Sequence, residues 1–166
     1  MSSTSSYPPT AEVLPNLPTR DLLRQKPQRI WSIEPEATVY RAIELMAEAR
    51  VGALLVIKDN KLVGIVSERD YARKVILVGR SSHSTSVEAI MTRTVVTVTL
   101  ETSLQSCMQL MTSHRIRHLP VIEGDQAIGI VSIGDVVRET LNQQRHALDE
   151  LQRYVSGEPR SLSGAP

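Results

Sequence analysis

The chain is poor in aromatic residues, with no phenylalanine, one tryptophan and four tyrosines among its 166 residues. Proteins that bind single-stranded nucleic acid stack the bases on aromatic side chains, so a surface of that kind is not expected. The net charge is also small, +1 at pH 7, because 19 basic side chains nearly balance 18 acidic ones. Such a charge gives no general electrostatic attraction to nucleic acid or to an anionic membrane. We therefore predict that the chain binds neither.

Cysteine and long apolar runs are equally scarce. Cys107 is the one cysteine, which excludes an intramolecular disulfide framework and fits a reducing compartment. No apolar run approaches the roughly 20 residues that cross a bilayer. The first ten residues lack the apolar core of a secretory signal, and their Ser/Thr-rich, acid-free composition leaves a transit peptide open, although the first arginine is Arg20. We predict a cytoplasmic protein.

What the sequence does contain is one stretch in two copies. Gly64–Asp70 reads GIVSERD, and Gly129–Asp135 reads GIVSIGD. Each copy predicts a buried strand that runs directly into the start of a helix. The serine of each copy is placed as an N-cap, beside a helix N-terminus whose free N–H groups favour anions such as phosphate. The aspartate that follows this serine, at the third position after it, is placed to accept hydrogen bonds from the cis-diol of a ribose.

A Ser-x-x-Asp pair at a helix start also has a purely structural interpretation. It resembles a capping box, in which each side chain bonds to the backbone N–H of the other residue, and an acidic residue in the first turn stabilises the helix dipole. A capping box prefers Glu or Gln in its last position because aspartate is short for the reach back, yet both copies have aspartate. The copies also match well beyond the cap. Both facts favour a ligand-binding role over capping alone.

The repetition extends over most of the chain. The shift that places Gly64 on Gly129 also aligns the whole stretch from Trp31 to Asp70 with the later sequence, without a gap. The identical pairs include Glu36/Glu101, Leu45/Leu110, Met46/Met111, Arg50/Arg115, Leu54/Leu119 and Val56/Val121. The apolar spacing in each copy predicts a strand, a helix, two further strands and a second helix. The expected fold class is therefore α/β (α+β), built from two tandem β-α-β-β-α repeats.

The two repeats leave a segment at each end of the chain. Residues 1–27 contain five prolines and are expected to form a tail or arm, in which Asp21–Leu23 favours a short helical turn that docks on the body. Repeat 1 is placed at 28–82 and repeat 2 at 83–142. Residues 143–166 are expected to extend the last helix to about Val155, with an apolar stripe that packs against a partner or the N-terminal arm.

These features resemble the cystathionine-β-synthase (CBS) domain pair, also called the Bateman module. The likeness covers about Gln28–Asn142 and rests on Ala37–Val39 at the start of a helix, on the strand His118–Ile122 and on the two Gly-h-h-Ser-x-x-Asp turns, where h is apolar. It implies a stand-alone regulatory protein whose repeats pack sheet to sheet about a pseudo-twofold axis. It also implies a homodimer, and two clefts that bind adenine nucleotides or related adenosyl compounds.

The resemblance further implies that each cleft takes its serine and aspartate from one repeat and its base-binding wall from the other. The first cleft is expected to comprise Ser67, Arg69, Asp70, Thr97, Ile116, Arg117 and His118; the second is expected to comprise Ser132, Gly134, Asp135, Ala42, Val51, Gly52 and Ala53. The pair Arg117-His118 is similar to one that faces phosphates in the regulatory subunits of AMP-activated kinases. Gly52-Ala53 stands at the matching positions of the second cleft. We therefore expect the first cleft to bind multiply charged phosphates more tightly, with Lys74 and the loop 80–82 as further candidate donors.

The sequence thus predicts a sensor that binds AMP, ADP, ATP or NAD(H), with S-adenosylmethionine less favoured, and that modulates an unidentified partner protein. The alternative is a constitutive interaction scaffold with vestigial clefts, assembled through its C-terminal helix. Both Ser–Asp pairs are retained, which favours the sensor.

An enzyme and a metal site are not expected. The sequence has no Ser–His–Asp set, no phosphate loop with lysine and no dinucleotide fingerprint, and Cys107 falls on the apolar face of its helix. His114 and His118 are spaced i, i+4, which binds metal on a helix. However, that helix is expected to end near His114, and Arg115 and Arg117 place positive charge beside any cation. We therefore predict no catalytic cofactor and no metal.

Overall fold

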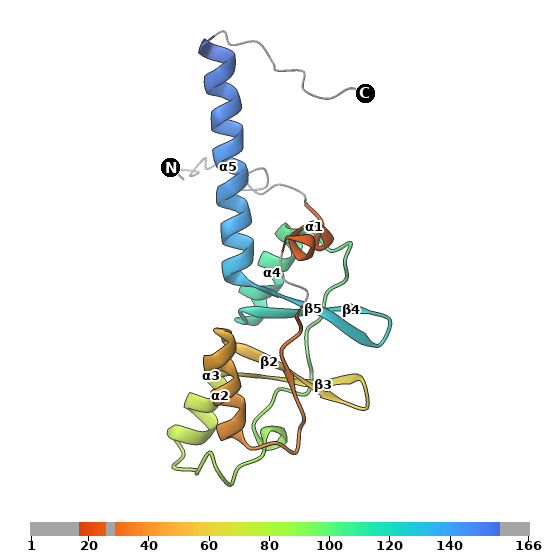
Figure 1. Cartoon of the computed structure of the whole chain (residues 1–166), viewed down its shortest axis with the longest axis vertical. Coiled ribbons are helices and arrows are strands. Elements are labelled where there is room, and N and C mark those ends of the chain that lie inside the picture. The colour runs from red at the N-terminus through yellow and green to blue at the C-terminus, as the bar shows by residue number, and fades with distance from the viewer. Residues whose placement is uncertain (1–16, 26–28, 157–166) are drawn as a thin grey trace, which may run out of the picture.

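The computed structural model of the chain describes residues 17–25 and 29–156. Two small sheets lie one above the other, each with its helices on the outer side, and one long helix rises from the upper half (Figure 1). The lower sheet contains β1 (Ser32–Ile33), β2 (Ala53–Lys58) and β3 (Lys61–Ser67) in that order, and the upper one contains β4 (His118–Glu123) and β5 (Gln126–Ser132). The helices are α1 (Thr19–Arg24), α2 (Val39–Ala49), α3 (Glu68–Tyr71), α4 (Leu104–His114) and α5 (Ile133–Ser156). A π-helical turn at Ala72–Ile76 continues α3, and Val87–Ala89 form a 3-10 turn.

The two hairpins have the same register, which confirms the predicted duplication. In the first, Ala53 pairs with Ser67, and in the second His118 pairs with Ser132, so both strands keep the shift seen in the sequence. Each hairpin also has an irregularity at the same place, after Val56 and after Val121. The predicted mixed α/β fold with two tandem repeats is therefore correct.

The repeats differ at their first strand. β1 pairs in parallel with β2 at both of its residues. The matching segment of repeat 2 is residues 96–98, where the repetition also predicts a strand, but it makes only a single parallel bridge, from Val98 to Val121. The Val98 N–H donates to the Pro120 carbonyl at 2.9 Å, and the Val98 carbonyl accepts from the Ile122 N–H, also at 2.9 Å. The segment is therefore held at Val98 alone. The strand β1 has only two paired residues. With a single pair, the matching segment of repeat 2 is an isolated bridge and no longer a strand.

The main helix of each repeat begins at a hydroxyl cap. Thr38 accepts a hydrogen bond from the Arg41 N–H before α2, and Ser103 accepts one from the Ser106 N–H before α4. The buried residues then recur at the same helical spacing, as Val39, Ala42 and Met46 in α2 and as Leu104, Cys107 and Met111 in α4. Each helix therefore covers its own sheet with one apolar face and gives each repeat a separate core.

Each repeat is completed by a segment from the start of the other half of the chain. The Thr19 N–H, at the start of α1, donates to the Thr102 carbonyl in repeat 2 at 2.8 Å. The Val87 N–H, near the start of repeat 2, donates to the Ala37 carbonyl in repeat 1, also at 2.8 Å. The shift between the repeats places Ala37 on Thr102, so the two contacts are equivalent. The predicted helical turn at 21–23 does dock on the body, and Leu22 is buried in the core of repeat 2. The rest of the expected tail, residues 1–16 and 26–27, lies outside the described residues.

Candidate functional site

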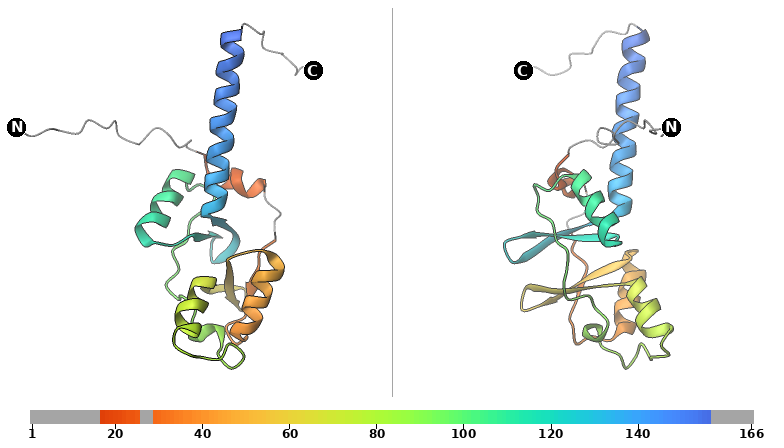
Figure 2. Two further views of the ribbon diagram at one scale, coloured as in Figure 1. Left: turned by 90° about the vertical axis from the view of Figure 1, so that its left-hand side faces the viewer. Right: turned by 180° about the vertical axis from the view of Figure 1, so that it is seen from behind.

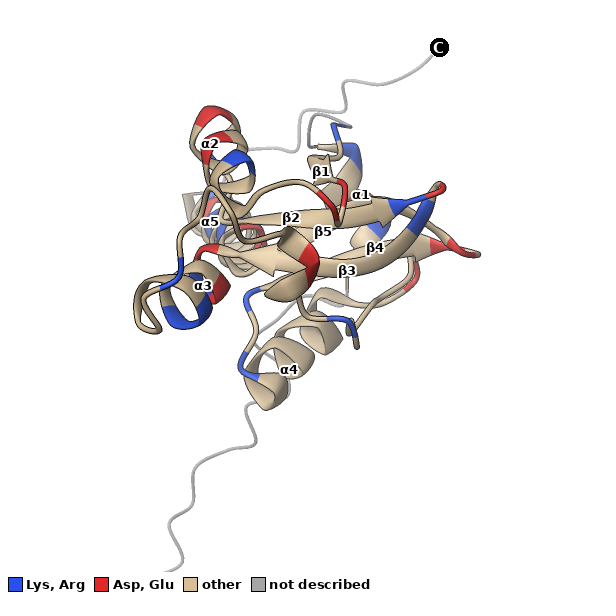
Figure 3. Cartoon of the chain, turned by 90° about the horizontal axis from the view of Figure 1, so that it is seen from below, with Lys and Arg blue, Asp and Glu red and all other residues tan. Residues whose placement is uncertain are grey.

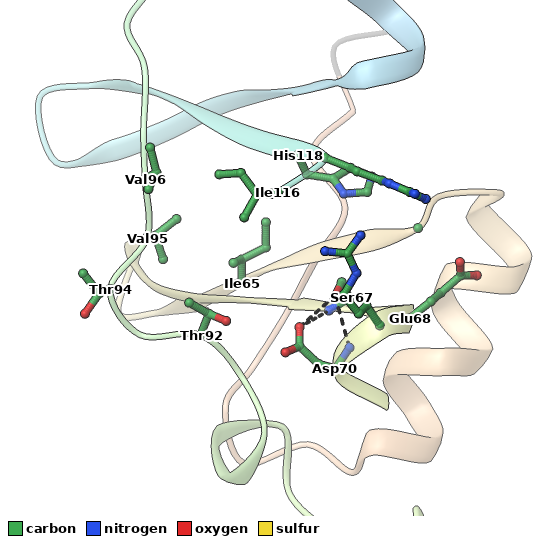
Figure 4. A pocket seen from close by; sticks show the side chains of 13 residues that line it. Ile65, Ser67, Glu68, Asp70, Thr92, Thr94, Val95, Val96, Ile116 and His118 are labelled. Atoms are coloured by element: carbon green, nitrogen blue, oxygen red, sulfur yellow. Dashed lines mark hydrogen bonds between the residues drawn. The ribbon is translucent and has the colours of Figure 1, made fainter. Parts of the chain in front are cut away.

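A cleft of about 240 Å³ lies between the two repeats at the end of β3. Figure 4 shows apolar side chains, among them Ile65 and Ile116, on one side of it and polar ones, among them Asp70 and His118, on the other. Repeat 1 lines the cleft with Gly52, Ile65, Ser67, Glu68, Arg69 and Asp70. Repeat 2 lines it with Ile116, Arg117 and His118 and, near its own start, with Thr92, Thr94, Val95 and Val96. The cleft therefore exists only where the two repeats meet.

The residues proposed for the first cleft come together in this structure, with one exception. Ser67, Arg69, Asp70, Ile116, Arg117 and His118 all line the cleft. Thr97 does not, and the wall next to it is built by Thr92, Thr94, Val95 and Val96. No sequence motif marks these four residues, which is why the sequence did not single them out.

The residues proposed for the second cleft are distributed differently. Gly52 lines the first cleft, where a Cβ added to it would lie 3.4 Å from the His118 ring. Ala42 is fully buried in the core of repeat 1, and Ala53 is 3% exposed. Val51 packs against the same core. Burial of this kind takes the side chains of Ala42 and Ala53 out of reach of a ligand.

The Ser67–Asp70 pair forms a capping box at the start of α3. The Ser67 Oγ accepts from the Asp70 N–H at 3.3 Å, while Asp70 Oδ2 accepts from the Ser67 N–H at 3.0 Å and from the Ser67 hydroxyl at 2.8 Å. The Ser132–Asp135 pair repeats these bonds at 3.2, 2.8 and 2.7 Å. The expectation that aspartate is too short for this role was wrong. The extended backbone of Ser67, at φ −130° and ψ 163°, accompanies the closed contact.

The second oxygen of Asp70 is also engaged. Lys74 Nζ lies 2.7 Å from Asp70 Oδ1 and donates to the Ile90 carbonyl at 2.6 Å. A carboxylate offers about four acceptor positions, and the Ser67 N–H, the Ser67 hydroxyl and Lys74 use three of them. Asp70 therefore retains capacity for about one hydroxyl group from the cleft.

The N-terminus of α3 does not offer free N–H groups at its first and third residues. The Glu68 N–H donates to the Gly52 carbonyl at 3.1 Å, and the Asp70 N–H is taken by Ser67. Repeat 2 has the matching bond from the Ile133 N–H to the Arg117 carbonyl, at 2.9 Å. An anion in the cleft would therefore rely on basic side chains more than on the helix dipole that the sequence suggested.

Arg69 connects the two repeats across the cleft. Its Nη1 donates to the carbonyl of Arg115 at 2.7 Å, and Arg115 is the left-handed residue that ends α4, with φ 54°. The position equivalent to Arg69 in repeat 2 is Gly134, which has no side chain to make such a bond. The two repeats are thus unequal at this contact, as they are at Arg117-His118 against Gly52-Ala53.

Cys107 is a core residue, as its place on the apolar helix face predicted. It is completely buried, and its Sγ lies 3.4 Å from the Thr19 hydroxyl of α1. Burial raises the pKa of the Cys107 thiol, and the Thr19 contact opposes this rise. The thiol is therefore kept protonated and unreactive at neutral pH.

Two further structural findings concern metals and membranes. Within 17–25 and 29–156, no three side chains of His, Cys, Asp and Glu are grouped closely enough to hold a metal ion. Over the same ranges, no helix combines the length and the apolar character that crossing a bilayer requires.

The charged residues are mixed in sign on the face seen in Figure 3, where basic and acidic residues are interspersed along α2, α3 and the hairpins.

Two stacked β-α-β-β-α repeats with a cleft between them define a CBS domain pair. The sequence model of the CBS domain matches residues 16–77 and 87–142, and the chain belongs to this family. The resemblance drawn from the sequence is therefore confirmed.

Named relatives agree with this assignment. The mitochondrial CBS domain-containing protein CBSX3 of Arabidopsis thaliana is 50% identical over 125 residues, which cover 72% of this chain and 61% of the relative. The structure of a putative signal-transduction protein with CBS domains from Burkholderia ambifaria has 48% identity and a TM-score of 0.74, and the match covers 76% of this chain and 96% of that one. The CBS domain pair of protein MJ0100, solved with 5-methylthioadenosine and S-adenosyl-L-methionine, has 24% identity and a TM-score of 0.68 over 78% of this chain and 99% of that one. The last comparison shows likeness of fold alone.

Proposed function

We propose that the chain is a regulatory sensor that binds an adenosine-containing ligand in the cleft between its repeats and modulates a partner protein. The observation that carries the proposal is the make-up of the cleft, which neither repeat can build alone. A ligand held there contacts both repeats, so its binding depends on how they are arranged. A ligand shifts an equilibrium between two arrangements by the difference in its affinity for them.

The lining fits the three parts of a nucleotide. Ile65, Ile116 and Val96 provide an apolar surface for the flat face of a base, beside a polar side on which Asp70 has room for one ribose hydroxyl (Figure 4). Arg117 and His118 line the side contributed by repeat 2, where phosphate oxygens of a bound nucleotide would meet them. The fold is compatible with this class of ligand, since the MJ0100 domain pair was solved with two adenosyl compounds.

The size of the cleft supports a small member of that class. Pockets for drug-sized ligands usually measure about 300–1,000 Å³, and this cleft measures about 240 Å³. AMP is therefore favoured over ADP and ATP, and all three over NAD(H), unless the repeats move apart. S-adenosylmethionine would find an acidic partner in Glu68 but like charge in Arg69 and Arg117.

Arg69 is the route by which we propose that binding reaches the partner protein. In this structure the guanidinium is bonded to the Arg115 carbonyl. A phosphate in the cleft competes for that guanidinium, because hydrogen bonds between two charged groups are stronger than those to a neutral carbonyl. Loss of the Arg69–Arg115 bond would loosen α3 from the end of α4 and change the surface that the repeats present together.

A constitutive scaffold is the second candidate, and one observation favours it. Capping alone accounts for both Ser–Asp pairs, so their retention does not by itself require a ligand. A thermal-shift screen separates the two functions, using AMP, ADP, ATP, NAD, NADH and S-adenosylmethionine, with GMP and inorganic phosphate as controls. At 100 times its dissociation constant a ligand stabilises by about 2.7 kcal/mol, which raises the melting temperature by several degrees. A response to an adenosyl compound alone supports the sensor, and no response to any compound supports the scaffold.

The proposal also includes a homodimer in the cytoplasm. One buried, protonated cysteine suits a reducing compartment, whereas the name of the plant relative places that protein in mitochondria. Fractionation of the source cells with an antibody to the chain decides between the two locations.

A further inference from the structure

The long helix α5 leaves the body after its first three turns. Asp135, Val136 and Glu139 are buried against repeat 2, and Gln143 is half-buried. From Gln144 to Ser156 every residue is exposed. In all three views of Figures 1 and 2 this part of α5 stands clear of both repeats.

Exposed apolar residues form a regular stripe along α5, which starts where the helix still packs on the body and runs to its end. Its members are Val137 (45% exposed), Leu141 (60%), Leu148 (60%), Leu151 (61%) and Val155 (85%). With Gln144 included, consecutive members are spaced alternately i, i+4 and i, i+3. An alternation of this kind is the heptad pattern of a two-stranded coiled coil.

The α5 stripe is accessible along its whole length. At the pitch of an α-helix its members fall within an arc of about 80°, whereas Val136 and Glu139, which face the body, fall outside that arc. The stripe from Val137 to Val155 is about 27 Å long, and its members point away from the side of α5 that packs on repeat 2. An isolated helix as short as the projecting part of α5 is marginal in water, so this part needs a cover to persist.

The charges of α5 argue against a membrane surface as that cover. The basic side chains of the helix are Arg138, Arg145 and Arg153, and its acidic side chains, Asp135, Glu139, Asp149 and Glu150, outnumber them. Helices that lie on anionic membranes are instead rich in Lys and Arg on the polar face. A stripe with a heptad period is, in contrast, complementary to a copy of itself.

We propose that the α5 stripe pairs in parallel with the α5 stripe of a second copy of this chain to form a short coiled coil. Parallel pairing places Gln144 against Gln144 of the second copy, and two amides can donate to and accept from each other, which fixes the register. Arg145 flanks the seam, and in parallel pairing its neighbour in the second copy is Thr140. Antiparallel pairing of the same stripes would bring the two Arg145 side chains together.

The association is tested by sedimentation velocity of the full chain over a range of concentrations. Leu148→Glu places a charge in the seam, and His146→Glu places the same charge on the opposite face of α5 as a matched control. We expect the dimer dissociation constant to rise at least 100-fold for L148E and to stay within about threefold of the wild type for H146E. A monomeric wild type, or an L148E variant that associates as the wild type does, overturns the proposal.

The orientation is tested by cross-linking. Under mild oxidation, Val155→Cys should give a covalent dimer, because parallel pairing brings the two copies of position 155 together, and Glu150→Cys on the outer face should not. Native Cys107 is buried and does not compete. A V155C dimer that fails to cross-link excludes the parallel arrangement. These experiments involve no cleft residue, so their failure would leave the proposed ligand site unaffected.

Discussion

At the residue scale, Asp70 shows that capping and ligand binding can share one carboxylate. Its Oδ2 closes the capping box with Ser67, while Oδ1 holds Lys74 and keeps about one acceptor position for a ligand. The side chain is 14% exposed, so that position is accessible from the cleft. A single additional hydrogen bond to a charged group is worth about 1.5–3 kcal/mol. This is less than a bidentate grip on a diol would supply.

Arg117 should act on phosphates and not on the nucleoside. Replacing it by alanine removes a charge from the cleft, and the screened loss of about 1 kcal/mol corresponds to roughly fivefold weaker binding per phosphate contact. We expect Arg117→Ala to weaken the binding of AMP or ATP by that factor or more and to leave adenosine within about twofold. Calorimetric titration at two salt concentrations measures both effects. Arg73→Ala, which removes a charge that does not line the cleft, serves as the control, and equal losses in the two variants would contradict a specific contact.

Cys107 gives a prediction for the pH dependence of stability. Burial raises the pKa of its thiol in the folded state above the value of about 8.5 in the unfolded chain. The folded state therefore holds the proton more tightly. The contribution of the thiol to the free energy of unfolding is complete below about pH 8.5 and is lost as the pH rises further. In denaturant titrations, the stability gap between the wild type and Cys107→Ala should be constant from pH 6 to 8 and should narrow toward pH 10. A gap that is independent of pH would show that the thiol does not titrate differently in the two states.

At the scale of elements, α1 belongs to the core of repeat 2. Leu22 is 5% exposed and packs with the buried residues of that core. Truncation of a buried leucine to alanine costs about 2–5 kcal/mol. We expect Leu22→Ala to lower the free energy of unfolding by that amount and Arg24→Ala, on the exposed side of α1, to change it by less than about 0.5 kcal/mol. Similar small effects in both variants would mean that α1 is only loosely attached.

The ends of α2 and α4 offer a stabilising change. Arg50 and Arg115 both adopt the left-handed conformation with φ 54°, which costs a residue with a side chain about 1 kcal/mol relative to glycine. Arg50→Gly should therefore stabilise the protein by up to about 1 kcal/mol. Ala49→Gly, one residue earlier and still helical, should destabilise it by a similar amount. Chemical denaturation of the two variants should show opposite signs, and the same sign in both would argue against strain at Arg50.

The helices and hairpins could be predicted from the sequence because their signals are local. Thr38 caps α2, and the apolar spacing after it belongs to a single helix. The sequence predicted that the turn at 21–23 docks on the body but not that it docks on repeat 2. That contact is not local, because Thr19 and its partner Thr102 are 83 residues apart. The place of Gly52 could not be derived either, because it depends on how the two sheets face each other. The short reach of aspartate misled the interpretation of the caps, since both Asp70 and Asp135 do accept a hydrogen bond from the N–H of their cap serine.

At the scale of the whole molecule, the repeats differ in the contact that Arg69 makes between them. Arg69 bonds to Arg115 across the first cleft, and Gly134 leaves the equivalent position of repeat 2 empty of any side chain. The Arg69 bond should hold the repeats together in the absence of ligand. We expect Arg69→Ala to increase hydrogen exchange at the end of α4 without ligand and to abolish any further change there when ligand is added. An unchanged ligand response in that variant would show that the signal takes another route.

The most direct test of the central claim compares Asp70→Asn with Asp135→Asn in calorimetric titrations with the adenosyl ligand that the thermal screen selects. The two residues make the same cap, so both variants lose similar stability, but only Asp70 lines the cleft. The account predicts that D70N binds roughly 10- to 100-fold more weakly than the wild type and that D135N binds within about twofold of it. Equal affinities in D70N, D135N and the wild type would contradict a ligand held by Asp70.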